Sequence, residues 1–444
     1  MTMTTATTAV GGLSRVEFQP NGHHPAWLTE ARRAAFGWVA EHGFPTLKDE
    51  DWRYTRLGPI LEVPFEPAVA GVTHRLSSAT IDALAADLGG TRLVFVNGHF
   101  ARELSSLTEL PEGATVTNLA SVLAEEAERL EPFFSRPFGP DHHAFTALNA
   151  ALAEDGAFVH LPAGTTVDEP IHLVFFSDNI GPPLVSSPRS LVRAGPRSRV
   201  TIVETYVGGP GDVYCTNAVT EVVLEEGAAV EHYKVQNESA TAFHLAVLDV
   251  RQGRDSTFSS HSVALGSSIA RHEVRVGLEA ERAEVSLDGL YMPRGGQHHD
   301  NPILIEHTAP HCTSRQLYKG VMDGHGHGVF NGRVVVRPGA AGTDAAQTNK
   351  NLLLSDHAEA DTRPRLEIFA DDVKCTHGAA VGRLDEDAVF YLRSRGVPHQ
   401  AARGLLTYAF ANEMVERLRL EPLRSQVENL VAGRLATSDD EVRT

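Results

Sequence analysis

Apolar residues follow two different spacings along the chain, and the changes between them divide it into three parts. From Trp27 to Val39 they recur every three or four residues, which is typical of an amphipathic helix. From about Gly156 onward, short β-branched runs alternate apolar and polar positions between turns of Gly, Pro, Asn and Asp. Helical spacing returns after Asp385. The pattern predicts a mainly β protein with helical segments at both ends.

The first part is predicted to be mostly helical. We expect a helix from Pro25 to a stop at Gly43, and further helices over residues 78–88, 119–130 and 143–152. Ser77 or Ser78 can cap the second helix, and a strand over residues 92–96 leads into an Asn-Gly turn. Residues 46–55 carry two aromatic residues among charges, Trp52 and Tyr54. We interpret this segment as a short amphipathic turn that packs against the first part.

The middle part shows no convincing helix over residues 156–382. Turns with a small residue, each followed by an alternating run, recur at spacings that often lie between 26 and 32 residues. Such a long series of short strands favours a β-solenoid, in which each coil buries its inner face against the next. A two-sheet sandwich or a cupin-like barrel is the second interpretation.

The last part is predicted to form three helices. Asp385 can cap the first, and Gly396 and Pro398 end it. The second, over residues 399–420, is expected to bury one face, and Pro422 to break it before a third helix over residues 423–435. The expected face consists of Ala401, Leu405, Tyr408, Ala409, Val415 and Leu418. We therefore divide the chain into a disordered lead-in (1–20), a mostly helical N-terminal domain (21–155), a β core (156–382) and a C-terminal helical domain (383–444).

Composition narrows the functional classes. The 444 residues carry a net charge of −18, which argues against nonspecific nucleic-acid binding. Three cysteines are too few for a disulfide framework and fit a reducing cytoplasm. Residues 1–12 lack the features of a signal peptide, and no apolar run reaches the roughly 18 residues of a membrane span. Phosphate-binding loops, dinucleotide-binding glycine motifs and nucleophile elbows are missing, so we expect no ATP hydrolysis by this chain alone.

Histidines cluster in the second half of the β region. His307 and His311 are four residues apart, but Pro310 makes a helix that would join them as metal ligands doubtful. His325 and His327 are spaced like the paired histidines of a cupin metal site, without the carboxylate that usually follows. A metal-dependent cupin-like enzyme that uses the region from His298 to His327 is therefore an alternative function. The cluster also includes His299, Asp300 and Cys312.

Cys375 and His377 form a second candidate site. In an extended segment, residues two apart point to the same side. A thiolate and an imidazole are suitable ligands for iron or zinc. Two ligands cannot complete a tetrahedral site, so other residues or another chain would have to supply the rest.

The residues around this pair resemble the C-terminal signature of the SufB/SufD family of iron–sulfur cluster assembly proteins. The signature is Asp372-Val373-Lys374-Cys375-Thr376-His377-Gly378-Ala379, followed by residues 390–396. Further similar segments are residues 305–310, 314–321, 328–332 and 344–355, and the resemblance extends over roughly residues 156–420. Residues 48–55, and the absence of an N-terminal cysteine cluster, are similar to the SufD branch.

The resemblance implies a right-handed parallel β-helix flanked by helical domains. It implies a noncatalytic, cytoplasmic scaffold that pairs with a SufB-like chain and docks a SufC-like ABC ATPase on its C-terminal helices. His377 matches a family histidine at the SufB–SufD interface where a transient iron–sulfur cluster is built, and Cys375 matches a neighbouring cysteine. A homodimer is possible in isolation, and no cofactor is expected on the isolated chain. The expected partner-binding residues are Asp385, Phe390, Tyr391, Arg395, Gly396, Leu405 and Phe410. A third alternative, a carbohydrate-active β-helix such as a lyase, is disfavoured by the missing signal peptide.

Overall fold

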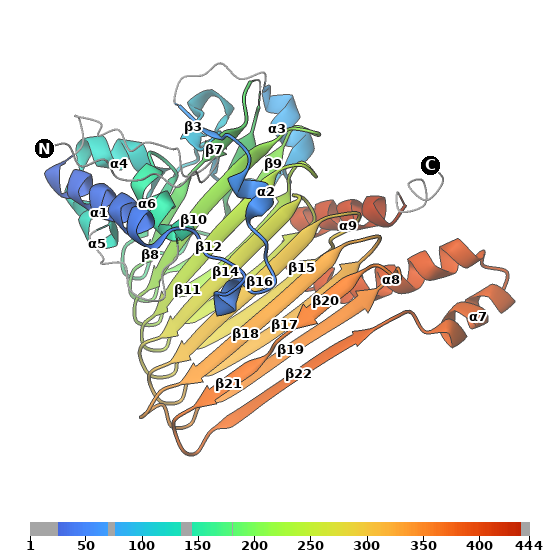
Figure 1. Cartoon of the computed structure of the whole chain (residues 1–444). Helices are drawn as coiled ribbons and strands as arrows, with labels where there is room; N and C mark the ends of the chain where they lie inside the picture. The colour runs from blue at the N-terminus through green and yellow to red at the C-terminus, as the bar shows by residue number, and fades with distance from the viewer. Residues whose placement is uncertain (1–24, 70–75, 135–143, 180, 437–444) are drawn as a thin grey trace, which may run out of the picture.

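The computed structural model describes residues 25–69, 76–134, 144–179 and 181–436, and these form a β-solenoid with helices at both ends (Figure 1). The N-terminal elements are α1 (Ala26–His42), η2 (Glu50–Trp52), α2 (Gly58–Leu61), β1 (Glu66–Pro67), α3 (Ser78–Leu84), β2 (Arg92–Val96), β3 (His99–Phe100), η3 (Arg102–Leu104), β4 (Thr115–Asn118), α4 (Leu119–Glu125), η4 (Ala127–Arg129), α5 (Glu131–Phe134) and α6 (Ala144–Leu152). The following strands are β5 (Ala157–Leu161), β6 (Ile171–Ser177), β7 (Leu184–Ser186), β8 (Arg189–Ala194), β9 (Arg199–Gly208), β10 (Tyr214–Leu224), β11 (Ala229–Asn237), β12 (Phe243–Gln252), β13 (Thr257–Ala264), β14 (Ile269–Leu278), β15 (Glu284–Tyr291), β16 (His298–His307), β17 (Thr313–Met322), β18 (His327–Val336), β19 (Asp344–Leu353), β20 (Glu359–Thr362), β21 (Arg365–Ile368) and β22 (Lys374–Gly382). The C-terminal helices are α7 (Glu386–Ser394), α8 (His399–Val415) and α9 (Glu421–Ala436).

The strands of the solenoid alternate between two sheets, so that each coil adds one strand to each sheet. One sheet runs through β8, β10, β12, β14, β16 and β18 to β20, and the other through β9, β11, β13, β15, β17 and β19 to β22. From β10 onward the neighbours are parallel and the paired residues lie 26 to 32 positions apart, as in Phe243 with Ile269 and Arg333 with Arg365. The predicted parallel solenoid and its repeat length are therefore confirmed. The antiparallel sandwich and the cupin-like barrel are wrong, because consecutive coils stack in parallel.

The interior of the solenoid is apolar along most of its length but contains several ionisable groups. Glu204, Lys234, Glu238 and His244 are each at most 6% exposed. His244 lies 2.7 Å from Glu238, and the Thr220 hydroxyl donates to Glu204 at 2.6 Å. Burial lowers the pKa of Lys234 to about 8, because it removes water from the ammonium group. These charges are tolerated in the interior because partners lie within reach.

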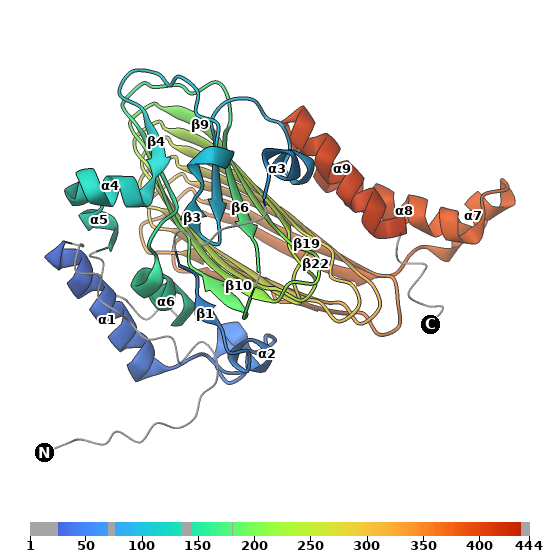
Figure 2. The same cartoon turned by 90° about the horizontal axis from the view of Figure 1, so that it is seen from above.

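The N-terminal helices cover one end of the solenoid, and a segment from them crosses one sheet. α1 packs on α6, whose residues are almost all buried (Figure 2). Residues 46–55, which we call the strap, lie across the outer face of the sheet that contains β14, β16 and β18 (Figure 1). Trp52 is 4% exposed and lies under the guanidinium of Arg271, 3.8 Å from the ring centre. The predicted packing role of Trp52 is confirmed, but the segment lies mainly on the β core, and Trp52 meets the helical part through Phe145.

The predicted N-terminal elements are present, with shorter helices than expected. Ser77 caps α3 by accepting from the Thr80 N–H at 3.2 Å, but α3 ends at Leu84 because Ala85 is extended. The helix expected over residues 119–130 is split into α4 and η4 at Glu126. The predicted lead-in, residues 1–20, lies outside the described residues. Within the described ranges, no helix is both long and apolar enough to cross a membrane.

The C-terminal helices α8 and α9 pack on the outer face of the sheet that ends in β22 (Figure 2). Met414, Val415 and Leu418 are fully buried there against the sheet. Lys319, on β17, donates to the carbonyl of Phe410 at 2.9 Å and pairs with Glu413. By contrast α7 projects from the end of β22, and Val389 is its buried residue (Figure 1).

Two details of the C-terminal prediction are wrong. Ala401, Leu405 and Ala409, expected on the buried face of α8, are exposed, because Ala402, Thr407 and Ala411 turn toward the sheet instead. Pro422 does not separate helices but lies in the first turn of α9, where a proline needs no N–H partner. The remaining predicted positions Tyr408, Val415 and Leu418 do face the core.

Candidate site at the open end of the solenoid

In the described part of the chain, the C-terminal coil of the solenoid has no covering strand. β22 pairs with β19 along its whole length, from Asp344 with Lys374 to Leu352 with Gly382. It is the last strand of its sheet, and β20 and β21 end the other sheet. Among the described strands, none pairs with the outer edges of this coil. An uncovered edge of this length is a ready template for pairing with another strand.

Every second residue of β22 directs its backbone groups to this open edge. The Lys374 N–H donates to the Thr343 carbonyl at 2.8 Å, so Lys374 faces β19. In a parallel ladder the N–H and C=O of one residue point to the same edge, and successive residues alternate. The residues that face the open edge are therefore Cys375, His377, Ala379 and Val381.

The side chains of the same residues face the interior of the solenoid. Cys375 and His377 are in register with Ala345 and Gln347, each 1% exposed in the coil beneath. In β22 the corresponding positions stay open because no further coil lies above them, and Val381 is 46% exposed. The structure thus places the predicted pair on one side, at the open mouth of the solenoid.

His377 is oriented by the opposite strand segment. Its Nδ1 lies 3.2 Å from the carbonyl oxygen of Pro364, which connects β20 to β21. Because a carbonyl can only accept, Nδ1 is the donor, which leaves Nε2 as the ring nitrogen available to a metal. A histidine held in this way is suited to bind a metal through Nε2.

Cys375 is half-buried beside the core. Burial raises the pKa of its thiol above the ordinary value, so the group is a neutral thiol at neutral pH. Binding of a metal would require loss of this proton. In the described residues no group of three or more His, Cys, Asp or Glu side chains is arranged to hold a metal ion. Cys375 and His377 therefore form at most part of a site.

The predicted partner-binding residues fall into three groups. Phe390 (70% exposed), Tyr391 (57%) and Leu405 (54%) project into solvent, and Arg395 lies over the Tyr391 ring at 4.9 Å. Phe410 instead packs under Lys319, with 4.3 Å between the ammonium nitrogen and the ring centre.

The other two predicted residues stabilise the ends of α7. The Asp385 carboxylate accepts from the Asp387 N–H at 2.9 Å, which caps the start of the helix. Gly396 turns the chain after the helix with φ 87°, a conformation that favours glycine. These roles within the chain explain Asp385 and Gly396 without any contact to a partner protein.

Two histidines of the cluster belong to a hydrogen-bonded chain, and the alternative metal sites do not form among the described residues. His307 ends β16 and His311 lies in a turn, so their four-residue spacing is not helical. His298 and His327 lie in neighbouring coils with 3.1 Å between their Nδ1 atoms, and Asp361 contacts the Nε2 of His327 at 2.8 Å. The sequence interpretation missed Asp361, although it follows His327 by about one coil length.

Comparison with known proteins assigns the chain to a family. The profile described as "SUF system FeS cluster assembly, SufBD core domain" matches residues 175–410, and the "SufBD protein N-terminal region" matches residues 19–173. The chain belongs to the SufBD family. It is 34% identical over 395 residues to the iron–sulfur cluster assembly protein SufD of Escherichia coli, covering 88% of this chain and 90% of that protein.

Two further relatives cover similar lengths. An iron–sulfur cluster assembly SufBD family protein of Synechocystis is 33% identical over 424 residues, covering 93% of this chain and 92% of that protein. The chloroplastic protein ABCI7 of Arabidopsis thaliana is 32% identical over 401 residues, covering 88% and 83%. The predicted family is confirmed, and this SufD-like chain takes part in iron–sulfur cluster assembly as a member of it.

Proposed function

We propose that this chain is a noncatalytic scaffold subunit that pairs with a SufB-like chain and docks a SufC-like ABC ATPase. The observation that carries the proposal is the open edge of β22, where backbone groups and the side chains of Cys375 and His377 are left without a covering coil. An incoming strand would satisfy that edge and cover the mouth. A second copy of this chain is the competing occupant in isolation.

The nascent cluster would be the cargo of this junction. The Nε2 of His377 and the thiolate of Cys375 would supply ligands from this chain, and the SufB-like chain would supply the others. Neither chain then holds the cluster alone, which suits a group that must be released to recipient proteins. The three cysteines are all unpaired, which fits our placement of the complex in the cytoplasm.

Docking of the ATPase is supported by exposed apolar side chains near the junction. Six of the nine exposed large apolar residues in the described ranges lie between Ile368 and Leu405. Phe390 and Tyr391 belong to α7, which follows β22 after three residues. A force on α7 would therefore reach the strand that carries His377 through a short connection. This chain would hydrolyse no ATP, since its sequence has no phosphate-binding loop.

The test is anaerobic cluster assembly on the complex co-expressed with SufB-like and SufC-like chains. We expect His377→Ala to leave the complex assembled and to reduce bound iron, sulfide and visible absorption strongly. Thr376→Ala is the matched control, because Thr376 is the neighbour that points to the outer face. Normal cluster assembly by the His377→Ala complex would remove this residue from the mechanism.

ATPase docking needs its own variant. A chain cut after Gly382 would uncover the sheet beneath α8 and α9, so its failure would be ambiguous. The double variant Phe390→Ser, Tyr391→Ser changes only exposed side chains of α7. We expect it to lose capture of the ATPase and to keep the SufB-like chain. Val69→Ser, at a 62% exposed residue far from α7 in the sequence, should change neither.

A further inference from the structure

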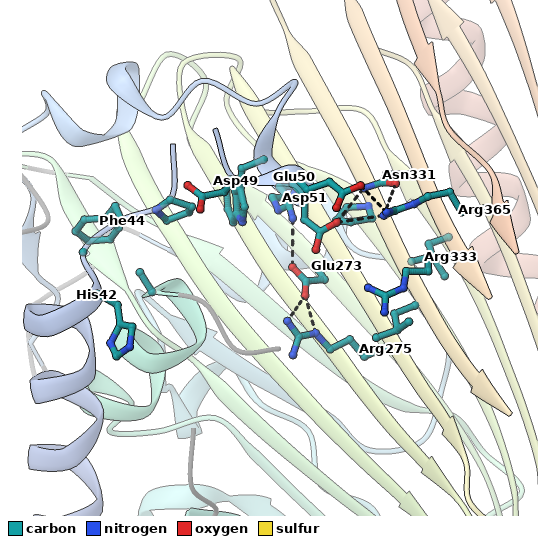
Figure 3. A pocket seen from close by; sticks show the side chains of 18 of the residues that line it. His42, Phe44, Asp49, Glu50, Asp51, Glu273, Arg275, Asn331, Arg333 and Arg365 are labelled. Atoms are coloured by element: carbon teal, nitrogen blue, oxygen red, sulfur yellow. Dashed lines mark hydrogen bonds and ion pairs between the residues drawn. The ribbon is translucent and has the colours of Figure 1, made fainter. Parts of the chain in front are cut away.

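A recess of about 440 Å³ lies between the strap, the end of α1 and the outer face of the sheet, and it reaches the final coil through Arg365 (Figure 3). Its volume is within the range of small-molecule sites. Figure 3 shows aromatic residues at one end and arginines at the other. The SufBD family assignment does not account for this arrangement.

The basic end is a row of side chains across four strands. Arg275, Leu304, Arg333 and Arg365 are in register on β14, β16, β18 and β21, so they stand side by side on the outer face. Neighbouring strands are about 4.8 Å apart, so the three arginines lie within a width of about 15 Å across the sheet. Like charges in such a row repel one another unless anions balance them.

Carboxylates balance this row unequally. Arg275 pairs with Glu273 at 2.5 Å, and Arg365 pairs with Glu50 of the strap at 2.9 Å. Arg333 contacts Glu367 through Nε at 3.0 Å. Among the described residues, the closest contact of Arg333 with Glu367 is made by Nε, and no hydrogen bond to its two terminal nitrogens is seen. Its charge also helps to lower the pKa of Glu50 at the rim. This arginine therefore keeps a planar pair of donors in the recess, the geometry that matches a phosphate or carboxylate.

The acidic residues of the recess do not compete for this role, and Asp49 accepts hydrogen bonds from Thr46 within the strap. Glu50 and Asp51 are 59% and 58% exposed at the rim, whereas the Arg333 side chain is 30% exposed and that of Arg275 15%. The carboxylate of the floor, Glu273, is 10% exposed and pairs with Arg271 and Arg275. The deeper part of the recess therefore favours an anion over a cation.

The opposite end offers flat apolar surface. Trp38 and His42 stack with 4.3 Å between ring centres at the end of α1, and Phe44 follows them in the connection to the strap. Aromatic rings at one end of a recess and an arginine fork at the other are suited to a ligand with a flat body and an anionic group. We propose that the recess binds a small organic anion, with its phosphate or carboxylate on Arg333 and its flat body against Trp38 and Phe44.

The experiment is calorimetric titration of the full chain with phenyl phosphate and with benzoate. We expect saturable binding at one site for at least one of them. The stronger of the two identifies the anionic group. Phenol and inorganic phosphate should each bind about tenfold more weakly than phenyl phosphate, because each lacks one half of the contacts. Added salt should weaken binding.

Variants separate the recess from general charge effects. Arg333→Gln should weaken binding about tenfold or more, since it removes the free donor pair. Arg337→Gln is the matched control, because Arg337 follows the same strand and pairs with Glu306 outside the recess. Phe44→Ala should weaken phenyl phosphate but not inorganic phosphate. The proposal would be overturned if neither aromatic anion bound saturably at millimolar concentration. It would also be overturned if Arg333→Gln and Arg337→Gln weakened binding equally.

Discussion

A proline in β22 tests whether the open edge is the junction with the SufB-like chain. The N–H of Ala379 faces the open edge, so Ala379→Pro removes one donor there and leaves the ladder to β19 intact. The Ala379 side chain is exposed at the mouth, so the proline ring meets no packed neighbour in the isolated chain. The variant therefore changes the junction rather than the fold.

The size of the effect follows from the backbone groups of the edge. Cys375, His377, Ala379 and Val381 present one N–H each to an incoming strand. Removing one leaves a carbonyl of the partner unpaired inside the junction, which costs about 1–3 kcal/mol. With the added bulk of the ring, we expect a loss of about 2–3 kcal/mol, equivalent to an affinity about 30 to 150 times weaker. The free energy of unfolding of the isolated chain should change by less than about 1 kcal/mol.

The assay is titration of the chain with its SufB-like partner, together with denaturant unfolding of each variant alone. Ala379→Ser is the matched control, because it keeps the N–H at the same position. The serine variant should bind within a few-fold of the native chain. Unchanged affinity of a folded Ala379→Pro variant would refute β22 as the junction.

Three further predictions concern stability and reactivity. Burial lowers the pKa of five histidines to about 3 or 4. Below about pH 6.5 the unfolded chain therefore binds protons that the folded chain does not bind. Between pH 7 and 5.5 each histidine should lower the free energy of unfolding by about 1 kcal/mol, measured by denaturant unfolding. These histidines are His172, His261, His298, His299 and His307. Cys375 should be alkylated well before the buried Cys215 and Cys312, which mass spectrometry would follow. The rate at Cys375 should rise with pH, because burial raises the pKa of its thiol and the thiolate is the reactive form. Lys319→Ala should destabilise the contact of α8 with the sheet by about 2 kcal/mol and speed proteolysis of the C-terminal helices, whereas Lys350→Ala, at an exposed neighbouring position, should have little effect.

The local pattern favoured the solenoid over a sandwich or barrel, and the family resemblance added that its strands are parallel. Alternation in each run places every second residue inside, and the turn spacing equals the length of one coil. The same alternation predicted that Cys375 and His377 share a side. It could not show that they lie at an open mouth, because alternation looks the same whether or not another coil follows.

Contacts between distant segments could not be predicted from the sequence. The strap meets the final coil through Glu50 and Arg365, which are 315 residues apart, and no spacing rule connects them. Asp361 reaches His327 only because consecutive coils stack. On α8, Leu405 and Ala402 are both apolar and only three residues apart, and the sheet beneath decides that Ala402 is buried.

Hydrogen exchange of the β22 amides tests the central claim most directly. In the isolated chain, at a concentration where it is monomeric, the amides of Thr376, Gly378 and Ala380 should be protected by β19, whereas those that face the open edge should exchange quickly. With the SufB-like chain bound, the amides of the open-edge residues should become protected as well. These are Cys375, His377, Ala379 and Val381. A stable complex in which they still exchange as fast as in the isolated chain would contradict the account.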